Sequence, residues 1–464
     1  MNKLYTIRRH TMRSTQNDAD MTQGVIWKHF VRFTLPMILG LLFQQLYNTV
    51  DTLVVGQFVG TEALAAVGST TSIVNMLVGL SAGLSTGASV VISQRYGAHD
   101  SNGLHDAVQT TIAVTLILCA LFTAVGIAIV QPMLNMMSTP EEVFGEAETY
   151  LTIYFSGIAG LLIYNMGSGI LRAVGDSRHP LYFLVFSALM NTVMDLLFVV
   201  VFKMGVAGVA WATIIAQFCS AILVLYTLSQ DSVPYGIKWK SLSIRKDMLK
   251  EILSIGLPSG VQQGLTSFSN VFVQSYINAF GAACMAGYSS YNKLDAFILI
   301  PAQAISMAST TFVGQNWGAN KPARARKGMW QALGMSLAST VVLTLGMLLL
   351  ARPLLRFFSP DEDVISYGVR FITIMTPFYF VISFYQIFAG ALRGVGSATA
   401  PMVIMLGSFV VFRQIYLYIA QQAGLGFVGV ALGYPMGWIV CSLSLSIAYA
   451  RSKLAKKHCT RPAG

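Results

Sequence analysis

The stretch PMILGLLFQQLYNTVD, residues 36–51, decides how the rest of the chain is interpreted. It lies in an apolar run from about residue 30 to residue 59, which is long enough to cross a bilayer as a helix at about 1.5 Å per residue. One polar stripe recurs on this run at helical spacing, formed by Gln44, Tyr47, Asn48 and Asp51. The stripe predicts a helix with one face turned toward protein or water rather than lipid.

Two residues make this predicted helix a candidate switch. An ionised Asp51 inside a bilayer would cost about 2.5–3.5 kcal/mol, so we expect it to face a protein interior or a water-filled cavity. The alternative is that Asp51 lies close enough to the helix end for headgroup water to reach it. Pro36 removes one backbone hydrogen bond, which predicts a bend in the helix at that point.

The composition is that of a polytopic membrane protein. Of the 464 residues, 55% are hydrophobic and only 11% are charged, whereas a soluble protein of this length carries about 25% charged residues. The five cysteines show neither close pairing nor metal-ligand spacing, so no disulfide framework and no zinc site are predicted. The chain has no G-x-x-x-x-G-K-[ST] motif, so we expect it not to contain a nucleotide-driven motor.

The apolar residues fall into twelve runs, each long enough to span a membrane. The runs are residues 31–56, 62–90, 107–131, 148–170, 181–202, 206–229, 251–278, 283–312, 328–350, 366–390, 401–421 and 427–450. Most Lys and Arg residues lie in the tails and in the loops on the side of the termini, a bias that places both termini in the cytoplasm. The net charge of +11 by itself would favour a nucleic-acid partner, but the distribution of the basic residues argues against one. We expect instead a protein embedded in the lipid bilayer of the plasma (inner) membrane.

The chain is built from two copies of one unit, because a single offset aligns motifs of the two halves. QRYGA at residues 94–98 matches QNWGA at 315–319, and GILRAVG at 169–175 matches GALRGVG at 390–396. Each copy holds six runs, so both copies enter the membrane from the same side as parallel repeats. Two such lobes around a central cleft are typical of an alternating-access transporter. A channel more often forms from identical subunits, and we expect this chain to act as a monomer.

The predicted fold class is an all-α polytopic membrane protein with twelve transmembrane helices in two parallel six-helix repeats. The predicted divisions are a disordered cytoplasmic tail at residues 1–24, a first lobe at 25–230, a cytoplasmic linker at 231–250, a second lobe at 251–450 and a basic cytoplasmic tail at 451–464.

A second polar group lies in the fifth and sixth runs of the first lobe. Asn191 and Asp195 are four residues apart and share one helix face, and Thr213 lies on the next run. The repeat equivalents of Asn191 and Asp195 are Phe412 and Tyr416, so the second lobe lacks this group. Carboxylate, amide and hydroxyl oxygens suit a hard cation or a proton. The alternative is a hydrogen-bond network that only holds helices together.

The chain resembles the multidrug and toxic compound extrusion (MATE) family, in the branch related to the DNA-damage-inducible efflux proteins. The resemblance rests on the 36–51 stretch and the two repeated motifs, and it covers about residues 25–450. It implies that Asp51, Asn191, Asp195 and Thr213 bind the coupling Na⁺ or H⁺. It also implies that Pro36 is the bend that responds. Another branch places coupling acids in the seventh and tenth runs. In this chain Thr266 and its neighbours, and residues 371–390, contain no carboxylate.

Other polar residues are candidates for a substrate cavity, with weaker support. They are Gln44, Asn48, Tyr150, Asn165, Lys293, Asp295 and Arg413. Lys293 and Asp295 are two residues apart and point different ways on a helix, so they are not simple partners. Asp295 could instead neutralise Arg413 across the lobe, or these charges could form a second patch that contacts substrate.

We therefore predict a secondary active efflux antiporter that exports amphipathic, cationic compounds in exchange for H⁺ or Na⁺. No cofactor other than the coupling ion is expected. One alternative is a lipid-linked saccharide flippase of the same superfamily, which would need a more basic cavity for pyrophosphate. A membrane-embedded enzyme would need a catalytic His, a nucleophile motif or a metal cluster in the apolar runs, and all six His lie outside them. A major-facilitator transporter would carry a basic loop between the second and third runs, which is missing here.

Overall fold

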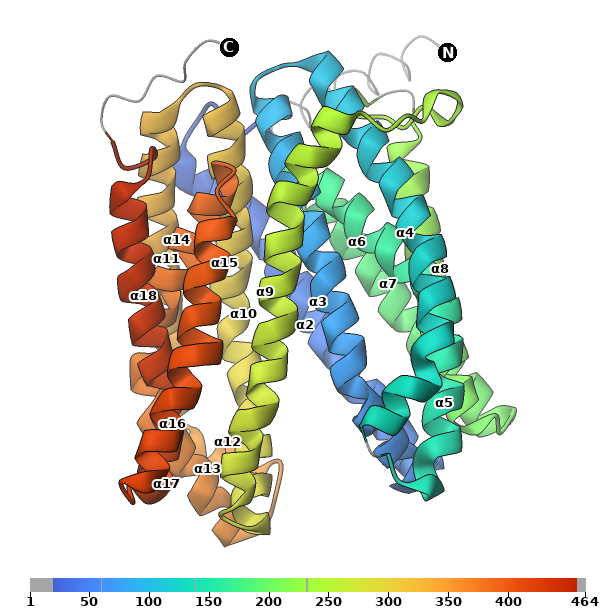
Figure 1. Cartoon of the computed structure of the whole chain (residues 1–464), viewed down its shortest axis with the longest axis vertical. Coiled ribbons are helices and arrows are strands. Elements are labelled where there is room, and N and C mark those ends of the chain that lie inside the picture. The colour runs from blue at the N-terminus through green and yellow to red at the C-terminus, as the bar shows by residue number, and fades with distance from the viewer. Residues whose placement is uncertain (1–19, 60, 138, 231–232, 457–464) are drawn as a thin grey trace.

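The computed structural model describes residues 20–456, except residues 60, 138 and 231–232 and the side chains of residues 51–53, 61–66, 69 and 72. The described part is almost entirely helical and contains no strand. Its helices form two lobes that lie side by side, as Figure 1 shows. The prediction of an all-α fold of two six-helix lobes is confirmed.

The first lobe contains six long helices or helix pairs in chain order. They are α2 (Ile26–Val54) with η1 (Val55–Val59), α3 (Thr61–Gly97), α4 (Ser101–Met136), α5 (Glu141–Ser156) with α6 (Ile158–Ala173), α7 (Arg178–Asp195) with η2 (Leu196–Val201), and α8 (Gly205–Leu228). A short 3-10 helix, η3 (Trp239–Ser241), lies in the link to the second lobe.

The second lobe repeats this order with more breaks. Its elements are α9 (Lys246–Asn278), α10 (Ala282–Gly318), α11 (Pro322–Leu349), α12 (Ala351–Arg356), α13 (Glu362–Met375), η4 (Thr376–Phe378), α14 (Tyr379–Gly394), α15 (Thr399–Leu406), η5 (Gly407–Phe412), α16 (Arg413–Gln422), α17 (Gly426–Ala431) and α18 (Gly433–Arg451).

Ten helices in the described part are long and apolar enough to cross a membrane. The pair α5 and α6, bent by 47° at its break, makes an eleventh if it counts as one span. Helix α9 has 33 residues and runs the height of the molecule in Figure 1, but it is too polar to pass the same test. The predicted run at 251–278 therefore forms a helix, but its polar side must pack against protein and not against lipid.

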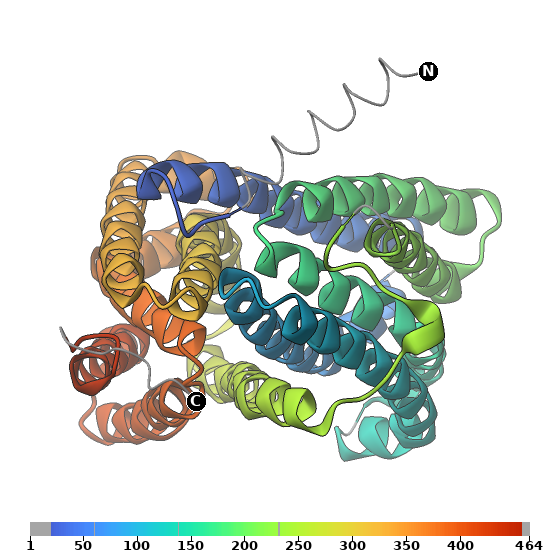
Figure 2. The same ribbon diagram turned by 90° about the horizontal axis from the view of Figure 1, so that it is seen from above.

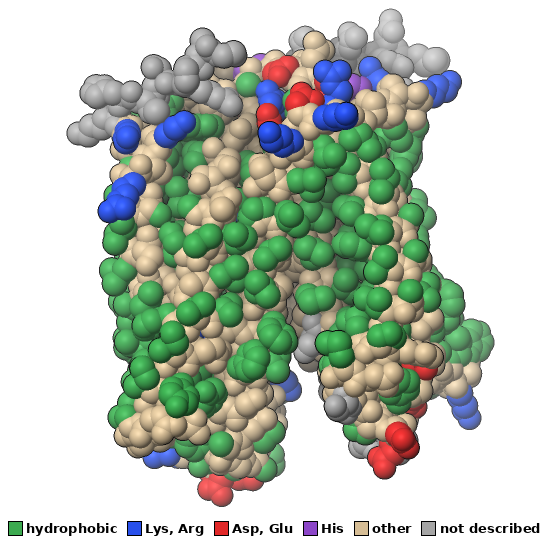
Figure 3. Space-filling model, in the orientation of Figure 1, with side chains coloured by type: hydrophobic (Ala, Val, Ile, Leu, Met, Phe, Trp, Pro, Cys, Tyr) green, Lys and Arg blue, Asp and Glu red, His purple; other side chains and the backbone are tan. Residues whose placement is uncertain are grey.

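Basic side chains gather at one end of the bundle, which Figure 3 shows at the top. We call this the basic end. Lys321, which directly precedes α11, donates to the carbonyl of Thr22, just before α2, and Arg326 of α11 donates to the carbonyl of Ala455, just after α18. Helix α2 therefore begins at the basic end, and α18 ends there. At the opposite end a notch separates the two lobes (Figure 3).

Helix α2 belongs to both lobes. Its first turns, at Ile26, Phe30, Phe33 and Met37, are buried in the hydrophobic core of the second lobe. Further along, Gly40 lies against Leu181 and Leu184 of α7, in the first lobe. Figure 2 shows α2 crossing from one lobe to the other along one side of the molecule. Pro36 lies inside this helix, near the point where it leaves the second-lobe core.

Candidate functional site

The two lobes touch at the basic end through a pair of reciprocal hydrogen bonds. Gln94 of α3 donates through Nε2 to the carbonyl of Gly394 at the end of α14, at 2.8 Å. Gln315 of α10 donates through Nε2 to the carbonyl of Ala173 at the end of α6, at 2.9 Å. These four residues are equivalent in the repeat, so each lobe gives the other the same contact. We call this pair the cross-lobe latch.

Two glycines allow the lobes to approach this closely. A Cβ placed on Gly97 would lie 1.9 Å from the carbonyl oxygen of Gln315, and one on Gly318 would lie 1.9 Å from the carbonyl oxygen of Gln94. A Cβ on Gly83 would likewise collide with the backbone of Gly260, at 2.1 Å from its nitrogen. Small residues at such positions let helix backbones pack in contact.

The segment before α2 is fastened to the latch. The backbone N–H of Met21 donates to Oε1 of Gln315, at 3.0 Å, so Gln315 joins this segment to the first lobe. The carbonyl of Met21 accepts from the Asn316 amide and the Arg324 guanidinium. Lys321 donates to the carbonyl of Thr22. Residues 21–23, which we assigned to a disordered tail, are therefore tied to the second lobe, whereas residues 1–19 lie outside the described part of the chain.

Beyond the latch lies a cavity of about 500 Å³ between the lobes, which we call the central cavity. A drug-sized ligand occupies a pocket of about 300–1,000 Å³. Apolar side chains such as Met37 and Phe409 line part of it, and amides such as Gln262, Gln303 and Asn165 line another part. This mixed lining suits an amphipathic ligand.

The charges of the central cavity come from a repeat-related pair of arginines. Arg172 of α6 and Arg393 of α14 both line it, and no Asp or Glu is among its described lining residues. Arg393 reaches Gln262 through one long contact of 3.5 Å, and its Nε has no hydrogen-bond partner in the described structure. At an effective dielectric constant of about 20, a unit charge 4 Å from a guanidinium interacts with it by about 4 kcal/mol. The sign of a ligand's charge therefore matters here.

The predicted cavity residues divide into two groups. Pro36, Gln44 and Asn165 line the central cavity. The other candidates do not line it: Asn48, Tyr150, Lys293, Asp295 and Arg413. Tyr150 is buried in the core of the first lobe, and Lys293 lies with Nζ 5.4 Å from the ring centre of Phe358. Sequence reasoning missed Arg172 and Arg393 as cavity residues, although both stand in the repeated Leu-Arg motif that it used to detect the duplication.

The polar group of the first lobe is deeply buried. Asn191 is 1% exposed, Asp195 is 0% exposed and Thr213 is 4% exposed. Ser187 of α7 donates to the carbonyl of Ala216 of α8 at 2.8 Å, which fixes how these antiparallel helices face each other. Asn191 is one turn beyond Ser187, and Thr213 is about one turn beyond Ala216 in the same direction, so the two lie on facing surfaces.

This group has the chemistry of a small cation site. The amide of Asn191 and the hydroxyl of Thr213 find no hydrogen-bond partner among the described residues, which is costly for buried polar groups. Their oxygens and the Asp195 carboxylate are ligand types that Na⁺ accepts, so the residues present fit such an ion. The π-helical segment η2 begins directly after Asp195. Such π-helical turns often mark functional sites. Asp51 is within α2, but its side chain lies outside the described residues, so its place in this group stays a prediction.

The second lobe holds a different polar group, built on tyrosines. Asp295 accepts hydrogen bonds from the hydroxyls of Tyr291 and Tyr379, and these two hydroxyls are 2.8 Å apart. Arg413 donates to Ser269 Oγ at 2.9 Å and Asn270 Oδ1 at 2.8 Å. Both charges are described, and no ion pair joins them. The possibility that Asp295 neutralises Arg413 is therefore wrong. Each charged group instead forms hydrogen bonds with neutral side chains.

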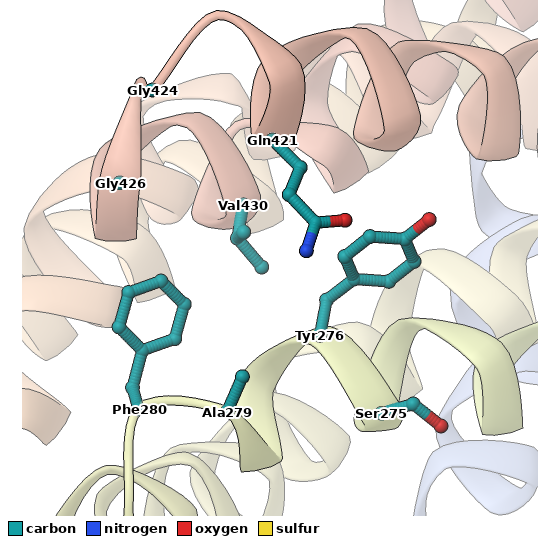
Figure 4. A pocket seen from close by; sticks show the side chains of 8 residues that line it. All are labelled: Ser275, Tyr276, Ala279, Phe280, Gln421, Gly424, Gly426 and Val430. Atoms are coloured by element: carbon teal, nitrogen blue, oxygen red, sulfur yellow. The ribbon is translucent and has the colours of Figure 1, made fainter.

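A smaller pocket of about 390 Å³ opens at the end of the second lobe away from the basic end. Figure 4 shows Tyr276 and Gln421 facing each other across it, with Phe280 and Val430 beside them. None of its lining residues carries a charge. The lining of this pocket includes no residue of the Asn191–Asp195 group or of the Asp295 and Arg413 networks, so it offers no charged group to an ion or substrate.

Comparison with known proteins reveals the same architecture. A family model described as MatE matches the chain twice, at residues 36–197 and 258–419. "Probable multidrug resistance protein YpnP" of Bacillus subtilis is 30% identical over 94% of this chain and 98% of its own length. "Probable multidrug resistance protein NorM" of Thermotoga maritima is 26% identical over 88% of this chain and 89% of its own length.

Solved structures agree in fold. One is described as the "outward-facing conformation of a multidrug resistance MATE family transporter of the MOP superfamily". It superposes with a TM-score of 0.88 at 24% identity, over 94% of this chain and 97% of that one. Another, from Pyrococcus furiosus, is described by the words "reverse polarity of binding pocket". It superposes with a TM-score of 0.89 at 24% identity, over 95% of this chain and 99% of that one.

Proposed function

Because the chain belongs to the MatE family of multi-pass membrane transporters, we propose that it is a secondary active multidrug efflux antiporter driven by H⁺ or Na⁺. The observation that carries this proposal is the buried group of Asn191, Asp195 and Thr213. A buried carboxylate is costly unless a proton, a cation or hydrogen bonds stabilise it. The amide of Asn191 and the hydroxyl of Thr213, which lie near it in the sequence and on the facing helix, have no hydrogen-bond partner among the described residues. The matching helices of the second lobe lack this group.

In this proposal, Asp51 joins Asn191, Asp195 and Thr213 as the coupling site. Helix α2 carries Asp51 beyond Pro36, lines the central cavity at Pro36 and Gln44, and begins in the second-lobe core. Loading of the coupling site with a cation or proton would change how α2 packs against α7. Pro36 would let that change reach the cavity as a bend. Transport and ion binding would thus be linked through one helix.

Alternating access is the second part of the proposal. The cross-lobe latch holds the basic end shut, while Figure 3 shows a notch between the lobes at the other end. If the basic end is cytoplasmic, as the charge bias indicates, this arrangement is open outward. Breaking the two glutamine contacts would then be required before substrate could enter from the cytoplasm.

The substrates are proposed to be amphipathic organic compounds. The sequence favoured cationic ones, whereas the central cavity is lined by two arginines, so the proposal here leaves the sign of the charge open. A basic cavity is also what the lipid-linked saccharide flippase would need. That alternative is not favoured, because relatives across almost the whole chain are named as multidrug resistance proteins.

The test is transport by the purified full chain in proteoliposomes, with Na⁺ and pH gradients imposed separately. We expect one of the two gradients to accelerate movement of a small amphipathic dye, and the accelerating gradient identifies the coupling ion. Expression in a strain without its own pumps should raise tolerance to such compounds. If neither gradient changes the rate at which any dye is moved, the antiporter proposal fails.

A further inference from the structure

We infer that the central cavity binds the anionic group of an amphipathic substrate, namely a carboxylate, sulfonate or phosphate, between Arg172 and Arg393. This inference rests on the proposed efflux function and adds the substrate class to it. It reverses the sign of charge that the sequence alone favoured. Its basis is the described lining of the cavity, which contains two guanidinium groups and no carboxylate.

The two arginines are available to a ligand. No acidic side chain in the described part of the chain is among the interactions of either guanidinium. Among the described residues, the Arg393 guanidinium has one long contact of 3.5 Å with Gln262, and its buried Nε has no hydrogen-bond partner. Guanidinium groups bind carboxylate and phosphate in planar, often bidentate geometry. A pair of such groups that lines a cavity with no described carboxylate in its lining is suited to receive an anion.

The rest of the lining supports the same ligand. The amides of Gln44, Gln262 and Gln303 line the cavity and can donate hydrogen bonds to anionic oxygens. Met307, Met405 and Phe409 supply apolar surface for the body of the compound. Thioether side chains adapt to ligands of different shape, which suits a cavity that accepts several compounds.

The anion site is distinct from the proposed coupling site. None of Asn191, Asp195 and Thr213 lines the central cavity, whereas the coupling helix α2 lines it through Pro36 and Gln44.

The experiment compares two dyes with the same xanthene ring system and opposite charge, the anion fluorescein and the cation rhodamine 123. Binding to the purified full chain in nanodiscs is measured at equilibrium by fluorescence polarisation, with no gradient. We expect fluorescein to bind more tightly. Arg172→Gln or Arg393→Gln should each weaken fluorescein binding by at least about tenfold, because each leaves the anion short of one charge partner. Rhodamine 123 binding should be unchanged or tighter.

Matched variants separate charge from folding. Arg172→Lys and Arg393→Lys keep the positive charge and should weaken fluorescein binding less than the Gln variants do. Arg352→Gln removes an arginine whose side chain is 70% exposed and lies outside the cavity. This variant should change the binding of neither dye. The inference is overturned if rhodamine 123 binds as tightly as fluorescein, or if the two cavity arginines can be replaced without loss of fluorescein binding.

Two further arms assign the source of the anion and keep the two proposals apart. Displacement of fluorescein by phenyl phosphate supports a soluble anion, and displacement by dihexanoyl phosphatidylglycerol supports a lipid phosphate; displacement by neither overturns the inference. Fluorescein binding without gradient-driven transport of any dye would support the anion site and refute the antiporter. Gradient-driven transport of rhodamine 123, with no binding or transport of fluorescein, would support the antiporter and refute the anion site.

Discussion

In the first lobe, α7 and α8 bury Asn191, Asp195 and Thr213, whereas the corresponding part of the second lobe buries Arg413 against the ring of Tyr434, 4.9 Å from its centre. The lobes nevertheless give each other identical contacts at the latch, through Gln94 and Gln315. The two lobes thus have equivalent residues where they meet and different residues where each buries its charged side chains. The equivalent residues hold the basic end closed, and the residues found only in the first lobe are proposed to bind the coupling ion.

The largest expected effect is on the first-lobe group. Asp195→Asn keeps the shape of the side chain and removes its charge, so it should abolish the gradient-dependent part of transport while substrate binding persists. Asp51→Asn should do the same, and the double variant should be little worse, since the two are expected to act as one unit. The measurement is dye efflux from proteoliposomes with and without a gradient.

The second lobe provides the matched control. Asp295→Asn changes the same chemical group in the tyrosine network and should leave the dependence on the gradient intact. Equal loss of coupling in Asp195→Asn and Asp295→Asn would show that the lobes do not differ in the way proposed. If Asp195→Asn keeps the native dependence of transport on the gradient, the first-lobe group is not the coupling site.

The next effect concerns the symmetric contact of the lobes. Gly97→Ala and Gly318→Ala each place a Cβ about where the other lobe's backbone lies, so each should prevent the basic end from closing. Pulsed electron–electron distances between spin labels on the two lobes at this end should lengthen. Gly334→Ala is the control, because nothing lies within 4 Å of the added Cβ. If only one of Gly97→Ala and Gly318→Ala opens the basic end, the two equivalent contacts do not contribute equally to closure.

A smaller shift should follow removal of the latch hydrogen bonds. Gln94→Ala and Gln315→Ala each delete one cross-lobe hydrogen bond worth about 1 kcal/mol. The double variant should therefore favour the state open at the basic end by about 2 kcal/mol, or roughly 30-fold. The same distance measurement reports the two populations. Gln421→Ala, at the opposite end of the second lobe, should leave the populations as they are. Unchanged distances in the double variant would leave the glycine contacts as the sole determinant of closure.

The smallest effect belongs to the tyrosine network. Tyr379→Phe removes one hydrogen bond to Asp295 and one to Tyr291, and should lower the midpoint of thermal unfolding by a few degrees without altering the choice of coupling ion. Tyr418→Phe is the control, because Tyr418 is 59% exposed. A change of coupling ion in Tyr379→Phe would move part of the coupling machinery into the second lobe.

Much of the fold follows from sequence patterns alone. The apolar runs predicted the spans, and the repeated motifs predicted the two lobes, because helix length and repetition are local properties. The close approach of the lobes depends on which backbones meet, and no spacing within one helix reveals that Gly97 lies on Gln315. The crossing of α2 into the second lobe is equally invisible, since Phe30 and Phe33 read as ordinary apolar positions of a first-lobe helix.

The candidate sites were predictable to different degrees. Asn191, Asp195 and Thr213 could be picked out because buried polar residues are rare in apolar runs, and the structure places Asn191 and Thr213 on facing helices. Arg172 and Arg393 were overlooked because they lie at the ends of their helices, where a basic residue is expected for reasons of topology. Only the three-dimensional lining shows that both lie at one cavity.

The polarity of α9 has a consequence for biogenesis. A helix carrying Gln262, Gln263 and Asn270 partitions poorly into lipid on its own, so it must leave the insertion machinery alongside a protein surface that covers those groups. Helix α3, which meets α9 at Gly83 and Gly260, supplies such a surface, and it is made earlier on the ribosome. The carboxyl-terminal half would therefore depend on the amino-terminal half as an intramolecular chaperone during membrane integration.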